Sequence, residues 1–224
     1  MKRLLVTLLT AFAACFGYVA PASADLLYTF NVSGCCGGGP FGTVLLHQTV
    51  ADSVEVTVSL NADVGFVNTG LEPFAFTLAG GLPALTGGSF SGLTGGFSLD
   101  PNTGFNDDGA GAFQYGLLCT TAVCGTGGGA PFMGPLHFIL TDTGLTEASF
   151  IANSSGNFFA IDMCFAWPDH TLSCNDQIPP GKTGAAWAKT PGTPPQQAPE
   201  PGILSLLAIA VLGFGFTTMR RRTV

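Results

Sequence analysis

Val54-Glu55-Val56-Thr57-Val58-Ser59-Leu60 alternates strictly between apolar and polar side chains. A period of two residues is typical of a β-strand with one buried face. The valines and Leu60 would face a core, and the polar residues between them would face water. A second β-rich segment, 43–50, precedes this one, and Ala51-Asp52-Ser53 between them has the composition of a tight turn. The stretch therefore predicts a β-hairpin.

Other β-rich segments lie on both sides of this hairpin, separated by clusters of Gly and Pro. No segment between the two ends has a sustained period of 3.6 residues, and the 19 Phe of the chain argue against disorder. We expect strands at 26–32, 73–78, 113–118, 136–141 and 158–163. Short strands at this spacing predict an all-β fold, an antiparallel β-sandwich with glycine-rich loops.

Two glycine-rich segments resemble each other within this region. Gly87-Gly88-Ser89-Phe90-Ser91 and Gly95-Gly96-Phe97-Ser98 lie about eight residues apart, and two copies are too few for a solenoid. We interpret them as one glycine-rich hairpin.

The N-terminal segment has the three parts of a secretory signal peptide. Lys2 and Arg3 are basic, 4–19 is apolar, and Ala22-Ser23-Ala24 forms an A-x-A cleavage site. We expect residues 1–24 to be removed as a signal peptide, which leaves a mature chain that begins near Asp25.

The rest of the chain divides by composition. Residues 25–188 form the exported domain, 189–198 a Pro-rich linker and 199–224 a C-terminal anchor segment. We expect Trp167 to fill the core beside Cys164, and Trp187 to lie free near the linker, where it could stack on sugars.

The exported domain is strongly acidic. Between Asp25 and Gly181 the sequence holds 13 Asp and Glu and no Lys or Arg. Such a surface repels nucleic-acid phosphates and anionic lipid head groups, so we expect neither as a partner.

Six cysteines remain once Cys15 leaves with the signal peptide, an even number that suits disulfides in an oxidising compartment. They are Cys35, Cys36, Cys119, Cys124, Cys164 and Cys174. Short loops favour the pairs 119–124 and 164–174, and leave Cys35 and Cys36 either as a vicinal pair or as partners of other loops. The alternative is a zinc site made of Cys164, His170 and Cys174, although the spacing fits no standard zinc knuckle.

One loop has the composition of a calcium site. It gathers oxygen-bearing side chains within ten residues: Asp100, Asn102, Asn106, Asp107 and Asp108. Calcium prefers such ligands, but the same residues are also ordinary in turns and the loop lacks the order of an EF-hand. We expect no other cofactor.

No catalytic motif stands out. There is no G-x-S-x-G elbow or H-E-x-x-H pair, and His47 and His137 are expected on the wet faces of strands. A secreted hydrolase that uses His170 with Asp169 or Asp162 is an alternative, but no residue is indicated as its nucleophile. We therefore expect no enzymatic activity.

The C-terminus combines three features in a fixed order. Pro199-Glu200-Pro201 precedes an uncharged apolar run of 17 residues, 203–219, and Arg220-Arg221-Arg222 follows it. As a helix the run would span about 26 Å, close to the thickness of a bilayer's hydrocarbon core. The arginines would keep that end in the cytoplasm by the positive-inside rule. We expect one transmembrane helix here.

This tail resembles the PEP-CTERM protein-sorting signal. The resemblance covers about a tenth of the chain and implies recognition of Pro199, Glu200 and Pro201 by an exosortase, a membrane-embedded cysteine transpeptidase, with Arg220, Arg221 and Arg222 retaining the chain in the membrane. It also implies passage from the inner membrane to the cell surface or extracellular matrix, and a connection with exopolysaccharide.

Together these features predict an exported structural or interaction protein of the cell surface. A calcium- or carbohydrate-binding adhesive module is the first alternative, and the secreted hydrolase is the second.

Overall fold

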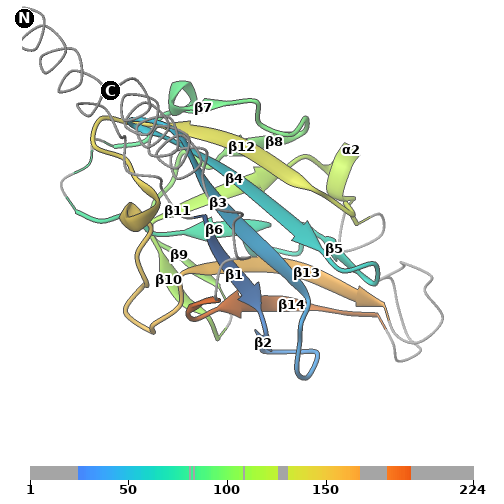
Figure 1. Cartoon of the computed structure of the whole chain (residues 1–224). Coiled ribbons are helices and arrows are strands. Elements are labelled where there is room, and N and C mark those ends of the chain that lie inside the picture. Colours follow the sequence, from blue (N-terminus) through green and yellow to red (C-terminus); the bar gives the residue numbers. More distant parts are fainter. Residues whose placement is uncertain are drawn as a thin grey trace, which may run out of the picture. The chain divides into compact units, whose positions relative to one another are not determined.

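The alternating segment forms strand β4 (Ser53–Leu60), which pairs with β3 (Gly42–Val50) in an antiparallel hairpin (Figure 1). Val54, Val56 and Val58 are fully buried, whereas the polar residues between them are partly exposed. In the turn, Asp52 has a φ of 64°, a left-handed conformation that Asp tolerates better than most residues. The predicted hairpin is confirmed.

The structure is a computed structural model that describes residues 25–80, 82, 84–107, 109–125, 131–166 and 181–192. The expected signal peptide, most of the linker and the whole C-terminal segment, with Pro199–Pro201 and Arg220–Arg222, lie outside these ranges. Within them, no helix is both long enough and apolar enough to cross a bilayer.

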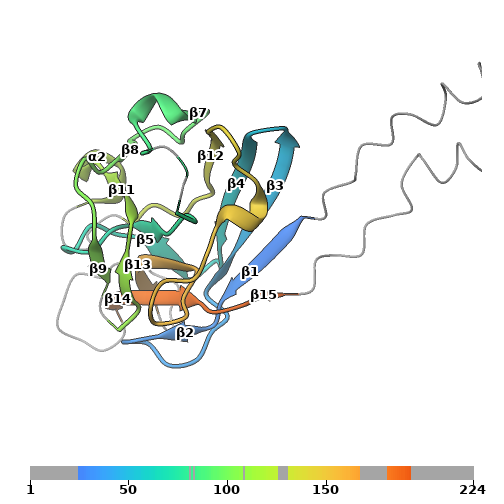
Figure 2. The same ribbon diagram turned by 90° about the vertical axis from the view of Figure 1, so that its left-hand side faces the viewer.

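The first sheet, sheet A, has six strands in the order β15-β1-β3-β4-β12-β7, and every neighbouring pair is antiparallel. The four strands around the hairpin are β1 (Leu26–Phe30), β12 (Leu136–Thr141), β7 (Phe90–Ser91) and β15 (Pro191–Gly192). β15 pairs with β1, so the first and last described strands lie side by side at one edge (Figure 2).

The second sheet, sheet B, has seven strands, and β13 lies at its centre. They are β2 (Val32–Ser33), β14 (Gly181–Ala188), β13 (Phe159–Ala166), β6 (Phe74–Phe76), β11 (Tyr115–Cys119) and β8 (Phe97–Leu99), with β5 (Val64–Phe66) paired to β13. A two-stranded ribbon joins β9 (Phe105–Asp107) to β10 (Gly111–Phe113). Among the described residues, helical structure is limited to η1 (Gly87–Ser89), α2 (Thr121–Cys124) and η2 (Glu147–Ser149).

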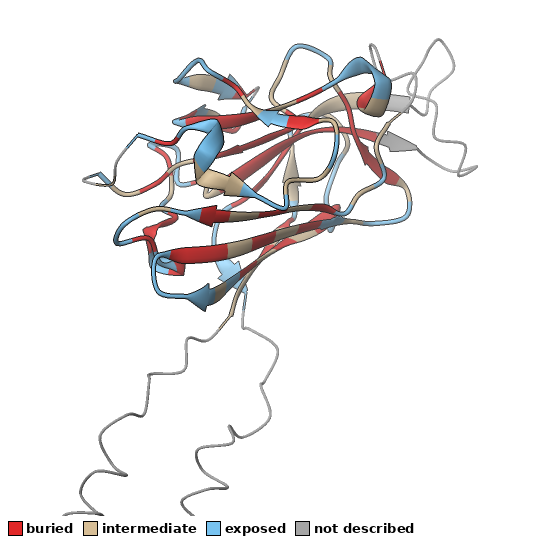
Figure 3. Cartoon of the chain, turned by 90° about the horizontal axis from the view of Figure 1, so that it is seen from above, coloured by how far each residue is buried: buried red, intermediate tan, exposed pale blue. Residues whose placement is uncertain are grey.

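The fold is therefore all-β and antiparallel, as predicted. Sheets A and B pack against each other in a sandwich-like arrangement. Buried stretches, red in Figure 3, run along many of the strands. The core between them is rich in aromatic rings. The ring centroid of Phe138 on β12 lies 6.1 Å from that of Phe74 and 6.4 Å from that of Phe76, both on β6. Each buried Phe contributes about 1.5–3 kcal/mol by leaving water.

The segment around Trp187 differs from the prediction. Trp187 is 8% exposed and lies on β14, where it pairs with Ala160 of β13 on one side and Val32 of β2 on the other. The expectation of a free Trp187 is wrong because β14 pairs with both β13 and β2, which places Trp187 within sheet B. Pro191 and Gly192, which we expected in the Pro-rich linker, pair with β1.

The glycine-rich hairpin is also wrong. β7, which contains Phe90, pairs with β12 in sheet A, whereas β8, which contains Phe97, pairs with β11 in sheet B. The two similar segments therefore belong to different sheets. Both phenylalanines pack against the same core from those two sheets, which local sequence similarity could not indicate.

Candidate functional site

Four titratable side chains form a row across the outer face of sheet A, which we call the acid–histidine row. His47 on β3 lies opposite Glu55 on β4, and Asp25 directly precedes β1. His137 on β12 completes the row. Both strand neighbours of Glu55 and of His137 are buried, as is Leu46 before His47, so alternation turns these three side chains outward.

Two close contacts join the row. His47 Nδ1 lies 2.6 Å from Asp25 Oδ1, and His137 Nε2 lies 2.8 Å from Glu55 Oε1. His137 Nδ1 is also 3.2 Å from the carbonyl oxygen of Gly92. Each of these two histidines therefore contacts its own carboxylate. This arrangement agrees with the expectation that both lie on the solvent-facing side of their strands.

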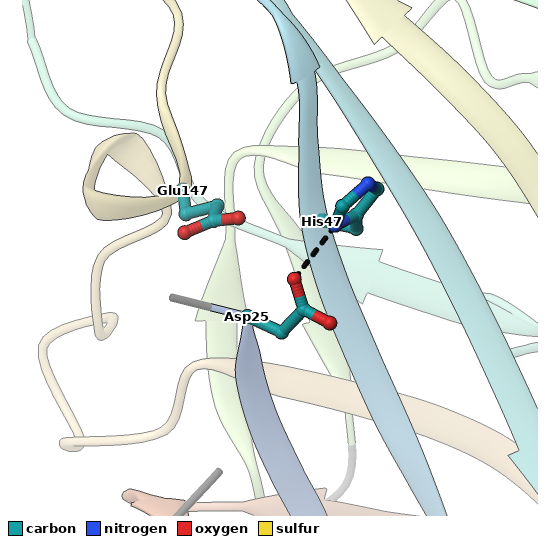
Figure 4. A group of neighbouring side chains, drawn as sticks. All are labelled: Asp25, His47 and Glu147. Atoms are coloured by element: carbon teal, nitrogen blue, oxygen red, sulfur yellow. Dashed lines mark hydrogen bonds and ion pairs between the residues drawn. The ribbon is translucent and has the colours of Figure 1, made fainter. Parts of the chain in front are cut away.

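A third carboxylate joins the Asp25 end of the row. Asp25, His47 and Glu147 each offer one donor atom, and these atoms all lie within 4.8 Å of one another (Figure 4). Glu147 belongs to η2 and is only 5% exposed, whereas the His47 side chain is 47% exposed. The backbone N–H of Gln48 donates to Glu147 Oε1 at 2.6 Å, which holds η2 against β3.

The electrostatics of this group are dominated by its carboxylates. The hydrogen bond with Asp25 raises the pKa of His47, partial burial opposes this, and the charges of Asp25, Glu55 and Glu147 raise it further. Beneath the group, burial and then the charge of Glu147 raise the pKa of Tyr28 to about 12. The sequence has no Lys or Arg from Asp25 to Gly181 that could balance these charges.

A small hollow of about 240 Å³ opens over this part of the sheet. It is lined by Asp25, Leu45, His47, Glu55 and Thr57. A hollow of this size is smaller than the usual pocket for a drug-sized ligand. One imidazole with two carboxylates is instead a donor set suited to a divalent transition metal such as zinc.

Comparison with known proteins adds no relative to this picture. No family model, no curated protein and no solved structure matches this chain. The functional argument therefore rests on its own residues.

The residues expected to bind calcium are only partly brought together. Asp100 and Asp107 are both buried and lie around Glu72, which the sequence did not single out. Asn102 folds back onto Asp100, with its backbone N–H 2.8 Å and its Nδ2 2.7 Å from Asp100 Oδ1. Asn106 is exposed because it alternates with Asp107 along β9. Asp108 lies outside the described residues.

The carboxyl group of Glu72 has a strongly raised pKa. Burial raises its pKa to about 8, and the charges of Asp100 and Asp107 together with a hydrogen bond to Asp100 add to the effect. The backbone N–H of Glu72 donates to Asp107 Oδ1 at 3.4 Å. Carboxyls this close favour sharing a proton or neutralisation by a cation.

Asp162, a candidate in the hydrolase alternative, is fully buried on β13. Its Oδ2 accepts hydrogen bonds from the backbone N–H of Thr69 at 2.9 Å and from Thr69 Oγ1 at 2.6 Å. Burial raises its pKa, and the hydrogen bonds from Thr69 and from the Leu71 backbone oppose this. These contacts give Asp162 a structural role in fixing the loop; Asp169 and His170 lie outside the described residues.

The cysteine pairs that the structure describes agree with the expected pairing. Cys119 is bonded to Cys124, and Cys35 to Cys36, which selects the vicinal pair from the two alternatives. Cys164 is also disulfide-bonded, and its expected partner Cys174 lies outside the described residues. A disulfide sulfur is not a thiolate ligand, so the zinc site on Cys164 is wrong.

Sequence reasoning missed the group of Asp25, His47 and Glu147. The hairpin register could have placed His47 opposite Glu55. Nothing local pointed to Glu147, because it reaches β3 across 99 residues of sequence.

Proposed function

We propose that this chain is an exported protein of the cell surface or extracellular matrix, with a structural or binding role rather than a catalytic one. An exosortase-type transpeptidase would sort it through Pro199–Pro201, the apolar run 203–219 and Arg220–Arg222. The protein would sit in the inner membrane with its C-terminus in the cytoplasm, and then move to the surface. Both ends of the sequence support this path.

The observation that carries the proposal is the oxidation state of the body. All five cysteines in the described ranges are disulfide-bonded. Disulfides persist in exported proteins and are rare in the reducing cytosol. The disulfides agree with an extracellular domain. The acidic composition of the body, which has no Lys or Arg between Asp25 and Lys182, agrees with it as well.

The two ends of the body also suit attachment through a single tail. β15 pairs with β1 at the edge of sheet A, so the first and last described strands of the body lie at the same edge (Figure 2). Exopolysaccharide is the partner that the PEP-CTERM resemblance implies.

Intact-mass measurement on surface and membrane fractions of the native host tests this function. We expect a chain that starts at Asp25 and ends near Pro201, or that carries an added group there. A Glu200→Ala variant should remain in the membrane fraction with its full C-terminus. Recovery of the unaltered protein as a chain reaching Val224 would overturn the sorting proposal.

A calcium-dependent adhesive module is the second candidate, and the grouping of Glu72, Asp100 and Asp107 favours it. Calcium would neutralise carboxyls that otherwise hold a proton. It predicts thermal stabilisation of the protein by calcium chloride, which Asp107→Asn should abolish. An unchanged melting temperature with added calcium would show that Glu72, Asp100 and Asp107 do not form a calcium site. Trp187 no longer supports sugar binding, because it is buried.

A further inference from the structure

We propose that removal of the signal peptide completes a zinc-type metal site. Its ligands would be the α-amine and carboxylate of Asp25, the imidazole of His47 and the carboxylate of Glu147. The inference rests on the proposed cleavage before Asp25, and it adds a ligand site to the proposed function. The hollow beside His47 gives the ion access from solvent.

The described side chains are nearly placed for such an ion. Zinc lies about 2.0–2.2 Å from nitrogen and oxygen ligands, so donors on a tetrahedral site are about 3.3 Å apart. The three donor atoms lie within 4.8 Å of one another, and the Asp25–His47 pair is 2.6 Å apart. The Asp25–His47 pair would open and Glu147 would approach by small amounts, which the exposed side chain of His47 allows.

The backbone around the group is well fixed. Leu26 pairs with Leu46 and Leu27 with Leu45, so β1 is held against β3 from its first residue. Glu147 is held by the N–H of Gln48, the residue after His47. The fold therefore brings the three ligand residues together before any ion binds, which lowers the cost of ordering them.

Cleavage changes the chemistry of Asp25. In the precursor its nitrogen belongs to a peptide bond, whose lone pair is delocalised into the carbonyl group. After cleavage the nitrogen is an α-amine, which can release its extra proton to solvent and bond to the ion through its lone pair. The amine and the side-chain carboxylate of one Asp close a six-membered ring on the same metal. The mature chain would thus supply four donors where the precursor supplies three.

The charge of the surroundings favours a cation. The carboxylates of Asp25 and Glu147 act on His47 together with that of Glu55. The sequence has no Lys or Arg from Asp25 to Gly181 to offset their negative charge. The carboxylates of Asp25 and Glu147 would neutralise the ion. Glu55 is held by His137 in the same row, so it would support the site electrostatically without being a ligand.

The test uses the processed protein from its host, with the N-terminus confirmed by intact mass. After dialysis against EDTA, zinc chloride is titrated by calorimetry, and thermal unfolding is followed with and without zinc. We expect one ion per chain and a rise in melting temperature. His47→Gln should weaken binding at least about tenfold. His137→Gln removes the other histidine of the row, which is not a ligand, and should weaken zinc binding far less than His47→Gln does.

A second variant tests the amine itself. Two glycines inserted between Ala24 and Asp25 move the new amine by about 7 Å and leave an amide on Asp25. The insertion precedes β1, so thermal unfolding without zinc should not change. We expect at least about a tenfold loss of zinc affinity.

Three outcomes separate the ideas. Equal affinities for the processed protein and the diglycine variant, or for the processed protein and His47→Gln, would overturn the metal site while leaving export intact. A mature chain that does not begin at Asp25 would overturn the proposed processing step. If that chain still bound one zinc tightly, the α-amine of Asp25 would be excluded as a ligand and the present inference would fail as well.

Discussion

The carboxyl group of Glu72 lies directly over Gly116 of β11. A Cβ added to Gly116 would come 2.6 Å from Glu72 Cγ, closer than real Cβ atoms approach, and a tight 3.0 Å from Oε2. Gly116 pairs with Ala75, and its carbonyl oxygen accepts from the N–H of Asp100. This glycine therefore makes the space in which Glu72, Asp100 and Asp107 meet.

We expect Gly116→Ala to destabilise the protein by about 1–3 kcal/mol, because the new methyl group must displace Glu72 from a packed position. Urea unfolding measures the change. Gly38→Ala is the matched control, since nothing lies within 4 Å of a Cβ at Gly38. In Glu72→Ala the obstacle is gone, so the two substitutions should be strongly non-additive. Additive effects would show that Glu72 does not occupy this space.

The stability of the protein should fall as the pH rises from about 4.5 to about 8. The ordinary pKa of 4.5 applies to Glu72 in the unfolded chain, and about 8 applies in the folded one. Between these values the unfolded state binds fewer protons, so the free energy of unfolding decreases with pH. The contribution of Glu72 is fully present below pH 4.5 and lost above pH 8.

Because Glu72 is only half-buried, solvent screening reduces the effect, and we expect a loss of about 1–2 kcal/mol. Urea unfolding in EDTA-containing buffer at several pH values measures it. Glu72→Gln, which stays neutral throughout, should flatten the profile in this range. Parallel profiles for the two proteins would contradict the raised pKa of Glu72.

Replacement of Trp187 should be among the most damaging single changes. Its ring belongs to a small buried cluster, separate from the main core, that also contains Phe113, Ala110 and Ala160. The ring lies 3.1 Å from the position that a Cβ on Gly109 would occupy. We expect Trp187→Ala to cost about 3–5 kcal/mol through the cavity that it leaves. Trp187→Phe should cost less. Denaturant titration measures the free energy of unfolding. A value for Trp187→Ala close to that of the wild type would show that Trp187 is not packed in the core.

The Cys119–Cys124 disulfide should add a modest amount of stability. It closes a short loop across α2, for which the chain-entropy model gives about 2 kcal/mol. The double variant Cys119→Ser, Cys124→Ser should lower the free energy of unfolding by about that amount. The buried Cys124 site should tolerate Ala better than Ser, because an unpaired hydroxyl there costs further free energy. Equal stability of the oxidised protein and the double variant would contradict the role of this bond.

Strands with an alternating pattern were predicted closely from the sequence. β3, β4 and β12 have the expected positions because a buried face at every second residue is a local property of the chain. β14 was missed. Its run Thr183-Gly184-Ala185-Ala186-Trp187-Ala188 has little apolar contrast, and it becomes a strand because β2 and β13 supply hydrogen bonds on both sides.

The sequence by itself determined the all-β class, the hairpin at Asp52, the Cys119–Cys124 pair and the acidic body, since each depends on local period, short loops or composition. Only the tertiary structure decided which distant residues meet. Glu147 reaches His47 and Asp25, and Glu72 reaches Asp100 and Asp107, because strand pairing and η2 bring them together. Contacts between residues far apart in the chain follow from the register and packing of whole sheets, and no local pattern encodes them.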